Sequence, residues 1–147
     1  MPEPRPVFNQ LNIVVRDMDA SVAFYRRLGL SLDAAPGSEH VAVPLPNDLL
    51  LELDSTNFVP QWDAGYRGAT GGTSVIGFSL ASREAVDELY ADLTGAGHSG
   101  RQQPYDAFWG ARYAIVEDPD GNPIGLMSPI DDARKFWPPA PPPRLPT

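Results

Sequence analysis

Three polar side chains interrupt apolar stretches of the sequence and are the first candidates for chemistry. Gln10 and Asn12 stand two residues apart in QLNIVV, and Glu52 stands in LLLELD. Side chains two residues apart on a strand point to the same face, so we expect Gln10 and Asn12 to share a surface. Their oxygens could ligate a hard cation or bind polar groups of an organic ligand, and Glu52 could also abstract a proton. An ionised Glu52 would pair well with a cationic ligand group.

The chain has no cysteine and only two histidines, which removes several kinds of catalysis. Disulfides, thiolate nucleophiles and cysteine-bound zinc are excluded, and no serine stands beside a histidine and carboxylate pair as nucleophilic catalysis requires. His98, in GAGHSG, is expected to be solvated in a loop. His40, in HVAVPL, is expected to be a structural or surface group, with the alternative that it faces a cleft as a donor.

Six aromatic residues gather in two segments and offer a second kind of binding surface. Flat rings stack against planar ligands with about 0.5 to 1.5 kcal/mol per contact beyond the area that they bury, and they attract cations. The alternative is that individual rings belong to the core or to a subunit interface. The six are Phe58, Trp62 and Tyr66 in residues 55–72, and Phe108, Trp109 and Tyr113 in DAFWGARY.

The elements that must position these side chains repeat in one order along the chain. Residues 10–15 alternate as in a strand, and apolar residues then recur at helical spacing up to Gly29, after which short strands follow. The same order recurs in the second half of the chain. The predicted strands are 10–15, 30–35, 40–45, 49–54, 74–80, 99–104, 110–117 and 122–127, and the two helices begin after Asp17 or Asp19 and after Ser82. The pattern predicts an α+β fold of two βαβββ modules.

Length and composition bound the domain organisation and the partners. A chain of 147 residues with 42% hydrophobic residues suits one domain with a real core. We expect this domain to span residues 1–130, with modules at about 7–54 and 73–130 and a linker at 55–72. The net charge of −8 argues against nucleic acid. No apolar run or leader is long enough for a membrane span or secretory signal, so we expect a cytoplasmic protein that does not bind membranes.

The last segment, residues 131–147, is rich in proline and is predicted to be a tail. WPPAPPPRLP favours an extended polyproline conformation that cannot join a helix or a central strand. It contains a P-x-x-P-x-R pattern that would suit a groove for proline-rich ligands. We favour the alternative that Phe136 and Trp137 anchor the tail on the body of the protein or on a second subunit.

Two stretches together resemble the vicinal oxygen chelate superfamily, which includes glyoxalase I, extradiol dioxygenases and bleomycin resistance proteins. They are NIVVRDMDASVAFYRRLGL at residues 12–30 and WGARYAIVEDPDGNPIGLM at residues 109–127. The resemblance implies paired βαβββ modules whose sheets curl around a cleft, commonly completed in a homodimer. It also implies four metal-ligand positions, which fall on Gln10, Glu52, Val75 and Gly125. Valine and glycine cannot donate, so the resemblance predicts a cleft without a metal or other cofactor.

The predicted function is therefore that of a metal-free binding protein, with no catalytic residues. It would sequester an aromatic compound such as an antibiotic, cationic if Glu52 is ionised, in the manner of bleomycin resistance proteins. The ligand-binding residues would be Gln10, Asn12, Glu52, Phe58, Trp62, Tyr66, Phe108, Trp109 and Tyr113. The alternative is a metal-dependent lyase, isomerase or extradiol dioxygenase with a degenerate metal site, using Gln10, Glu52 and a further donor such as His40. The missing side chain of Gly125 is expected to leave room for the ligand.

Overall fold

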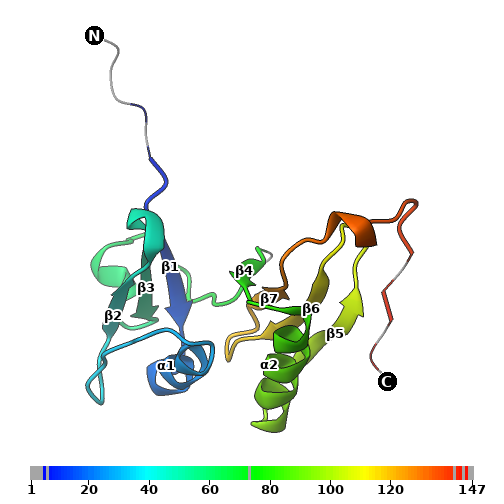
Figure 1. The fold of residues 1–147 in the computed structure, drawn as a ribbon. Helices are drawn as coiled ribbons and strands as arrows, with labels where there is room; N and C mark the ends of the chain where they lie inside the picture. Colours follow the sequence, from blue (N-terminus) through cyan, green and yellow to red (C-terminus); the bar gives the residue numbers. More distant parts are fainter. Residues whose placement is uncertain (1–4, 6, 73, 141, 144, 146–147) are drawn as a thin grey trace. The chain divides into compact units, whose positions relative to one another are not determined.

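A computed structural model describes residues 5, 7–72, 74–140, 142–143 and 145. The chain forms two compact units, residues 1–71 and residues 72–147, which follow one another in Figure 1 from blue to green and from green to red. Each unit contains one sheet and one α-helix, in a βαβββ-like order. The helices of the described residues are too short or too polar to cross a membrane.

The first unit has a three-stranded mixed sheet in the order β1-β3-β2. Strand β1 runs parallel to β3, and β2 runs antiparallel to it. The elements are β1 (Gln10–Val15), α1 (Met18–Arg27), β2 (His40–Pro44) and β3 (Leu50–Ser55), with short 3₁₀ turns η1 (Pro46–Asp48) and η2 (Val59–Gln61).

One face of this sheet is apolar and lies under α1, which packs against β3. The alternation of residues along each strand separates this buried face from a polar one. The buried face carries Ile13, Val15, Val41, Val43, Leu51 and Leu53, and α1 adds Val22, Phe24 and Tyr25. Asp17 caps the helix by accepting from the amide of Ala20 at 3.1 Å, and Gly29 follows its end with a φ of 101°. Of the two N-caps that the sequence left open, Asp17 and Asp19, the structure has Asp17, and the predicted stop at Gly29 is confirmed.

The second unit has a four-stranded sheet in the order β4-β7-β6-β5, with α2 packed against β5, β6 and β7. Strand β4 runs parallel to β7, and the other neighbours are antiparallel. The buried side chains Val86 and Leu93 of α2 belong to the same core as Val116 and Leu126. The elements are β4 (Ile76–Ser79), α2 (Arg83–Gly95), β5 (Gly100–Asp106), β6 (Arg112–Glu117), β7 (Pro123–Met127) and the 3₁₀ turn η3 (Asp132–Arg134).

The predicted α+β fold of two βαβββ-like modules is confirmed, but the strand predicted at residues 30–35 is wrong. Two of its backbone groups bond to residues of α1 instead of to a neighbouring strand. The guanidinium of Arg26 donates to the carbonyl of Leu32 at 2.8 and 2.6 Å, and the amide of Leu30 donates to the carbonyl of Tyr25 at 3.1 Å. The weakly signalled strand at 99–104 is present as β5. Its pairing with β6 shifts register on both sides of Gln102, as suits an edge strand that contains Pro104.

The proline-rich tail contacts the second unit. The amide of Phe136 donates to the carbonyl of Phe108 at 3.0 Å, and the rings of Phe108 and Trp137 lie 5.7 Å apart. Further along, Gln102 of β5 donates to the carbonyl of Pro143 at 2.8 Å. The expected anchoring by Phe136 and Trp137 is thus seen within the unit. Within the P-x-x-P-x-R pattern at residues 139–144, Pro141 and Arg144 lie outside the described residues.

Candidate functional site

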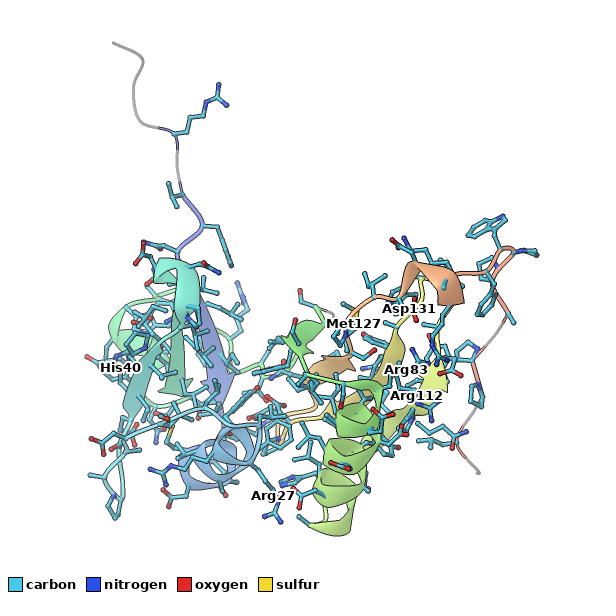
Figure 2. The ribbon with its side chains drawn as sticks, in the orientation of Figure 1. Arg27, His40, Arg83, Arg112, Met127 and Asp131 are labelled. Carbon is cyan, nitrogen blue, oxygen red and sulfur yellow. The ribbon has the colours of Figure 1, made fainter. Side chains whose placement is uncertain are left out.

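The polar face of the first sheet brings together side chains from all three of its strands. Asn12 of β1 pairs in register with Glu52 of β3, and His40 of β2 pairs with Asp54 of β3. Paired residues point to the same side of a sheet, so these four share the face opposite α1. His40 extends from β2 and is labelled in Figure 2.

A pocket of about 260 Å³ opens on this face. Its walls combine the polar side chains of the strands with two aromatic rings from the segment that follows β3. That segment turns back because the amide of Phe58 donates to the carbonyl and the hydroxyl of Ser55, at 2.9 and 3.1 Å. The lining residues are Gln10, Asn12, His40, Glu52, Asp54, Phe58 and Trp62.

A hydrogen-bond network runs across the floor of the pocket. The side-chain nitrogen of Asn12 donates to Glu52 Oε2 at 2.6 Å and to Asp54 Oδ2 at 2.8 Å. The other oxygen of Asp54 bonds to Nδ1 of His40. Asp54 is fully buried, whereas the side chain of His40 is 43% exposed. The network therefore holds two carboxylates at the pocket, and with both ionised its net charge is negative whether or not His40 is protonated.

Five of the nine predicted ligand-binding residues line this pocket, and the other four do not. Gln10, Asn12, Glu52, Phe58 and Trp62 meet there. The hydroxyl of Tyr66 instead donates to the carbonyl of Ala69 at 2.8 Å and closes its own loop. Phe108, Trp109 and Tyr113 belong to the second unit. His98 lies in the loop after α2, as predicted, but is half-buried.

Two pocket residues were missed as ligand contacts by sequence reasoning. Asp54 follows Glu52 by two positions, so the period of the strand alone could have placed it on the same face. His40 was weighed as a residue that could face a cleft, but its contact with Asp54 depends on the register between β2 and β3. That register spans a turn of irregular conformation in which Asn47 and Asp48 have φ of 66° and 59°.

The aromatic residues of the second unit contact one another edge to face. The ring centroids of Trp109 and Tyr113 are 5.2 Å apart at 71°, and Tyr105 meets both rings at 6.5 and 6.4 Å. The indole nitrogen of Trp109 donates to the sulfur of Met127 at 3.3 Å. Burial raises the pKa of Tyr105, with a smaller contribution from Tyr113, and burial also raises the pKa of Tyr113. Part of the surface of these rings is therefore covered by their contacts with one another.

An exposed aromatic concavity of about 420 Å³ lies beside this cluster. It is formed where the tail meets the segment before β6. The lining residues are Phe108, Trp109, Lys135, Phe136 and Trp137. Lys135 makes it less suited to a cation than the pocket of the first unit.

The space beside Gly125 is not free. Gly125 of β7 pairs with Ile115, and Tyr113 lies on the same face of β6. A Cβ atom at position 125 would stand 2.8 Å from the hydroxyl of Tyr113 and 3.3 Å from two of its ring carbons. The expectation that the glycine leaves room for a ligand is therefore wrong, because the phenol of Tyr113 fills that room.

The sequence and fold match known proteins of one kind. The family model described as Glyoxalase/Bleomycin resistance protein/Dioxygenase superfamily matches residues 7–126. The chain belongs to this superfamily. No curated protein matches the chain at a significant level.

Solved structures similar to the chain share the superfamily fold at low identity. One is a glyoxalase/bleomycin resistance protein/dioxygenase from Nocardioides, with 23% identity, a TM-score of 0.66, and coverage of 88% of this chain and 87% of that one. Another is a family enzyme from Burkholderia phytofirmans, with 21% identity, a TM-score of 0.69, and coverage of 82% and 97%. A third is a lactoylglutathione lyase from Agrobacterium tumefaciens, with 20% identity, a TM-score of 0.62, and coverage of 86% and 96%. At these identities the likeness concerns the fold alone.

The residues at the superfamily's metal positions do not fit a metal ion. Val75 lies before β4 and is 51% exposed, and the register places Gly77 opposite Gly125. In the first unit the amide of Asn12 turns its nitrogen, which is a donor, toward both carboxylates. Among the described residues there is no group of three or more His, Cys, Asp or Glu side chains that could hold a metal ion.

Proposed function

We propose that the protein binds a small, planar, cationic molecule in the pocket of the first unit and acts by sequestering it. The observation that carries the proposal is the lining of that pocket. Glu52 and Asp54 supply two carboxylates, Phe58 and Trp62 supply rings, and neither lysine nor arginine is present among the lining residues. A cation would gain from the carboxylates and from the ring faces at once.

The negative charge of the pocket favours a cation over a neutral or anionic ligand. Asn12 bridges the carboxylates with one amide group, which carries no net charge. An entering cation would compensate the negative charge of the two carboxylates, which the neutral amide does not. The net charge of −8 over the whole chain acts in the same direction at longer range.

The size of the pocket limits the ligand. Its volume of about 260 Å³ lies below the range of about 300 to 1,000 Å³ usual for drug-sized ligands. The pocket thus suits a small heteroaromatic cation or one ring system of a larger antibiotic. The homodimer expected from the resemblance, and a contribution of Phe108, Trp109 and Tyr113 to ligand binding, stay predictions.

The three tryptophans allow a direct test, because one lines this pocket and two line the aromatic concavity of the second unit. In a W109F/W137F variant Trp62 is the only tryptophan. We expect proflavine, a planar cation, to quench its fluorescence saturably. Acridine, which has a similar ring system and is uncharged at mildly alkaline pH, should bind more weakly.

The matched variant is Glu52→Gln, which removes one charge and keeps the shape of the side chain. Loss of a charged contact of about 1.5 kcal/mol should weaken proflavine binding about tenfold and leave acridine binding nearly unchanged. Absence of saturable quenching, or equal affinity for the two compounds, would count against the proposed function. If proflavine quenches the fluorescence of a W62F variant but not that of the W109F/W137F variant, the ligand binds in the second unit instead.

A further inference from the structure

The contact between His40 and Asp54 has the form of a positioned base. Asp54 is buried and fixed from a second side by the amide of Asn12. His40 lies above it with Nδ1 bonded to the carboxylate and with its ring partly exposed in the pocket. We propose that His40 is a general base, with Asp54 as its positioning residue, and that the pocket abstracts a proton from a planar small molecule.

The carboxylate decides which nitrogen of the imidazole can act. An ionised carboxylate only accepts hydrogen bonds, so Nδ1 of His40 must carry the hydrogen. In the neutral ring Nε2 then holds the lone pair, and it is the nitrogen that gains and loses a proton. Within the described residues the ring makes no other hydrogen bond, so Nε2 is free to meet a substrate.

The surroundings of His40 suit such a role. The ring of Phe58 lies 5.5 Å from the imidazole at a tilt of 37°, and offers a flat apolar surface beside it. The charged groups that face His40 across the pocket are Glu52 and Asp54 of β3, whereas β1 contributes only the neutral amides of Gln10 and Asn12. The positive charge that forms when Nε2 takes a proton would thus lie beside the carboxylate of Asp54 and in the same pocket as that of Glu52.

The proposed step is a single proton transfer. The bond between hydrogen and a carbon or oxygen atom of the substrate breaks, its electron pair stays on the substrate, and the proton moves to Nε2. Asp54 keeps its charge and compensates the imidazolium, and the proton later leaves to solvent. No oxidant, reductant or metal ion takes part.

The inference rests on the proposed function in one respect, namely that the pocket admits a small planar molecule. It adds turnover for a molecule that carries an acidic hydrogen, whereas a ligand without one is held unchanged. The two fail separately. Saturable quenching of Trp62 by proflavine without any proton abstraction overturns the base and leaves the binding proposal intact. Absence of quenching together with proton abstraction that depends on His40 overturns the proposed cation binding and leaves the base intact.

A planar probe with an acidic C–H bond, 5-nitrobenzisoxazole, gives the test. When a base removes the proton from its ring carbon, the electron pair forms a nitrile and the N–O bond breaks, which releases a coloured phenolate. We expect the full-length protein to catalyse this elimination saturably and faster than the same concentration of free imidazole. General-base catalysis typically contributes a factor of about 100 or more, so His40→Gln should lower the rate by about that factor.

The other histidine provides the matched control. His98→Gln removes an imidazole outside the pocket and should leave the rate unchanged. Equal rates for wild type and His40→Gln, or a rate no higher than that of free imidazole, would overturn the proposal. Proflavine binding measured in His40→Gln separates loss of the base from loss of the pocket.

The role of Asp54 has a spectroscopic readout that does not depend on activity. Nitrogen-15 NMR of the histidine rings should show neutral His40 with its hydrogen on Nδ1, and Asp54→Asn should shift the hydrogen toward Nε2 and slow the elimination. A wild-type ring with its hydrogen on Nε2 would contradict the assignment. Because Asp54 is buried, the wild-type spectrum decides the point even if the variant does not fold.

Discussion

Asn12 holds together the polar side of the first unit. One side-chain nitrogen reaches two carboxylates, Glu52 and Asp54, which lie two positions apart on the same face of β3 and would otherwise repel each other. Each bond joins a neutral donor to a charged acceptor, which makes it stronger than a bond between neutral groups. An uncharged residue thus holds the two carboxylates together at the pocket, where they could bind a cation.

Replacement of Asn12 by alanine should destabilise the protein. Both carboxylates lose a donor, and Asp54 is buried, so we expect the free energy of unfolding to fall by about 1 to 3 kcal/mol. Urea denaturation followed by circular dichroism measures the change. Gln10→Ala, two positions away on the same face but exposed, is the matched control and should change stability by about 0.5 kcal/mol or less. Equal losses in the two variants would contradict the role given to Asn12.

Gly125 and Tyr113 form a second pair that can be tested at this scale. Gly125→Ala should cost about 1 to 3 kcal/mol, because the added methyl group meets the hydroxyl of Tyr113 and the sheet is already packed. Removing that hydroxyl with Tyr113→Phe should recover part of the loss in a double-mutant cycle.

The matched control is Gly77→Ala on the neighbouring strand. Gly77 pairs with Gly125, and an added Cβ there would meet no atom within 4 Å. This variant should leave the free energy of unfolding nearly unchanged. Additive effects of Gly125→Ala and Tyr113→Phe would show that the phenol does not occupy the space beside the glycine.

At the scale of elements, the face of β5 and β6 that bears Tyr105 and Tyr113 is a layer of aromatic rings. The indole of Trp109 completes it and is itself held by Met127 of β7, which is labelled in Figure 2. The contacts are edge to face, the arrangement that ring quadrupoles favour. Because burial disfavours the ionised phenol, the layer stays neutral over a wider pH range than free tyrosine would.

The raised pKa values of Tyr105 and Tyr113 predict that the folded protein loses stability at alkaline pH. Tyrosines of the unfolded chain ionise near the ordinary pKa of 10.0, whereas Tyr105 and Tyr113 in the folded chain ionise at higher pH. The unfolded state therefore releases protons first, and stability that is fully present below pH 10 falls as the pH rises through the folded pKa values. Urea denaturation across this range should show the fall. A Y105F/Y113F variant should show a smaller one, and an unchanged slope would contradict the cause.

At the scale of the whole molecule, most of the acidic side chains lie outside the candidate pocket. The chain carries a net charge of −8, yet few of its acidic groups face the candidate pocket. The distant charges act on a ligand mainly by attraction through solvent, which salt screens over about 10 Å at 0.1 M ionic strength. The carboxylates in the pocket act at contact distance and are screened much less.

Proflavine binding should accordingly weaken with added sodium chloride, while acridine binding should not. We expect the loss to level off above the salt concentration at which the long-range attraction is screened, because the contact with Glu52 persists. Titrations of Trp62 fluorescence at several salt concentrations provide the measurement. A Glu52→Gln variant should keep the salt-dependent part and show a smaller residual preference for the cation, because the carboxylate of Asp54 remains in the pocket. Equal salt dependence for the two compounds would contradict this division of charge.

The sequence by itself determined the elements and their repeat, because these follow from local rules. Period-two alternation set β1, and the caps at Asp17 and Ser82 set the starts of both helices. It also placed Gln10 and Asn12 on one face of a strand, and the family resemblance added Glu52 to the same site. It could not show that the backbone carbonyl of Leu32 bonds to α1, because that depends on where the Arg26 side chain reaches.

Only the tertiary structure decided what these residues do together. The register of β2 against β3 set His40 beside Asp54, and the register of β6 against β7 set Tyr113 in the space of Gly125. Both pairings join positions whose meeting depends on turn geometry and packing rather than on local pattern. For that reason the sequence predicted a binding surface, whereas the proposed base within it appeared only once the strands were paired.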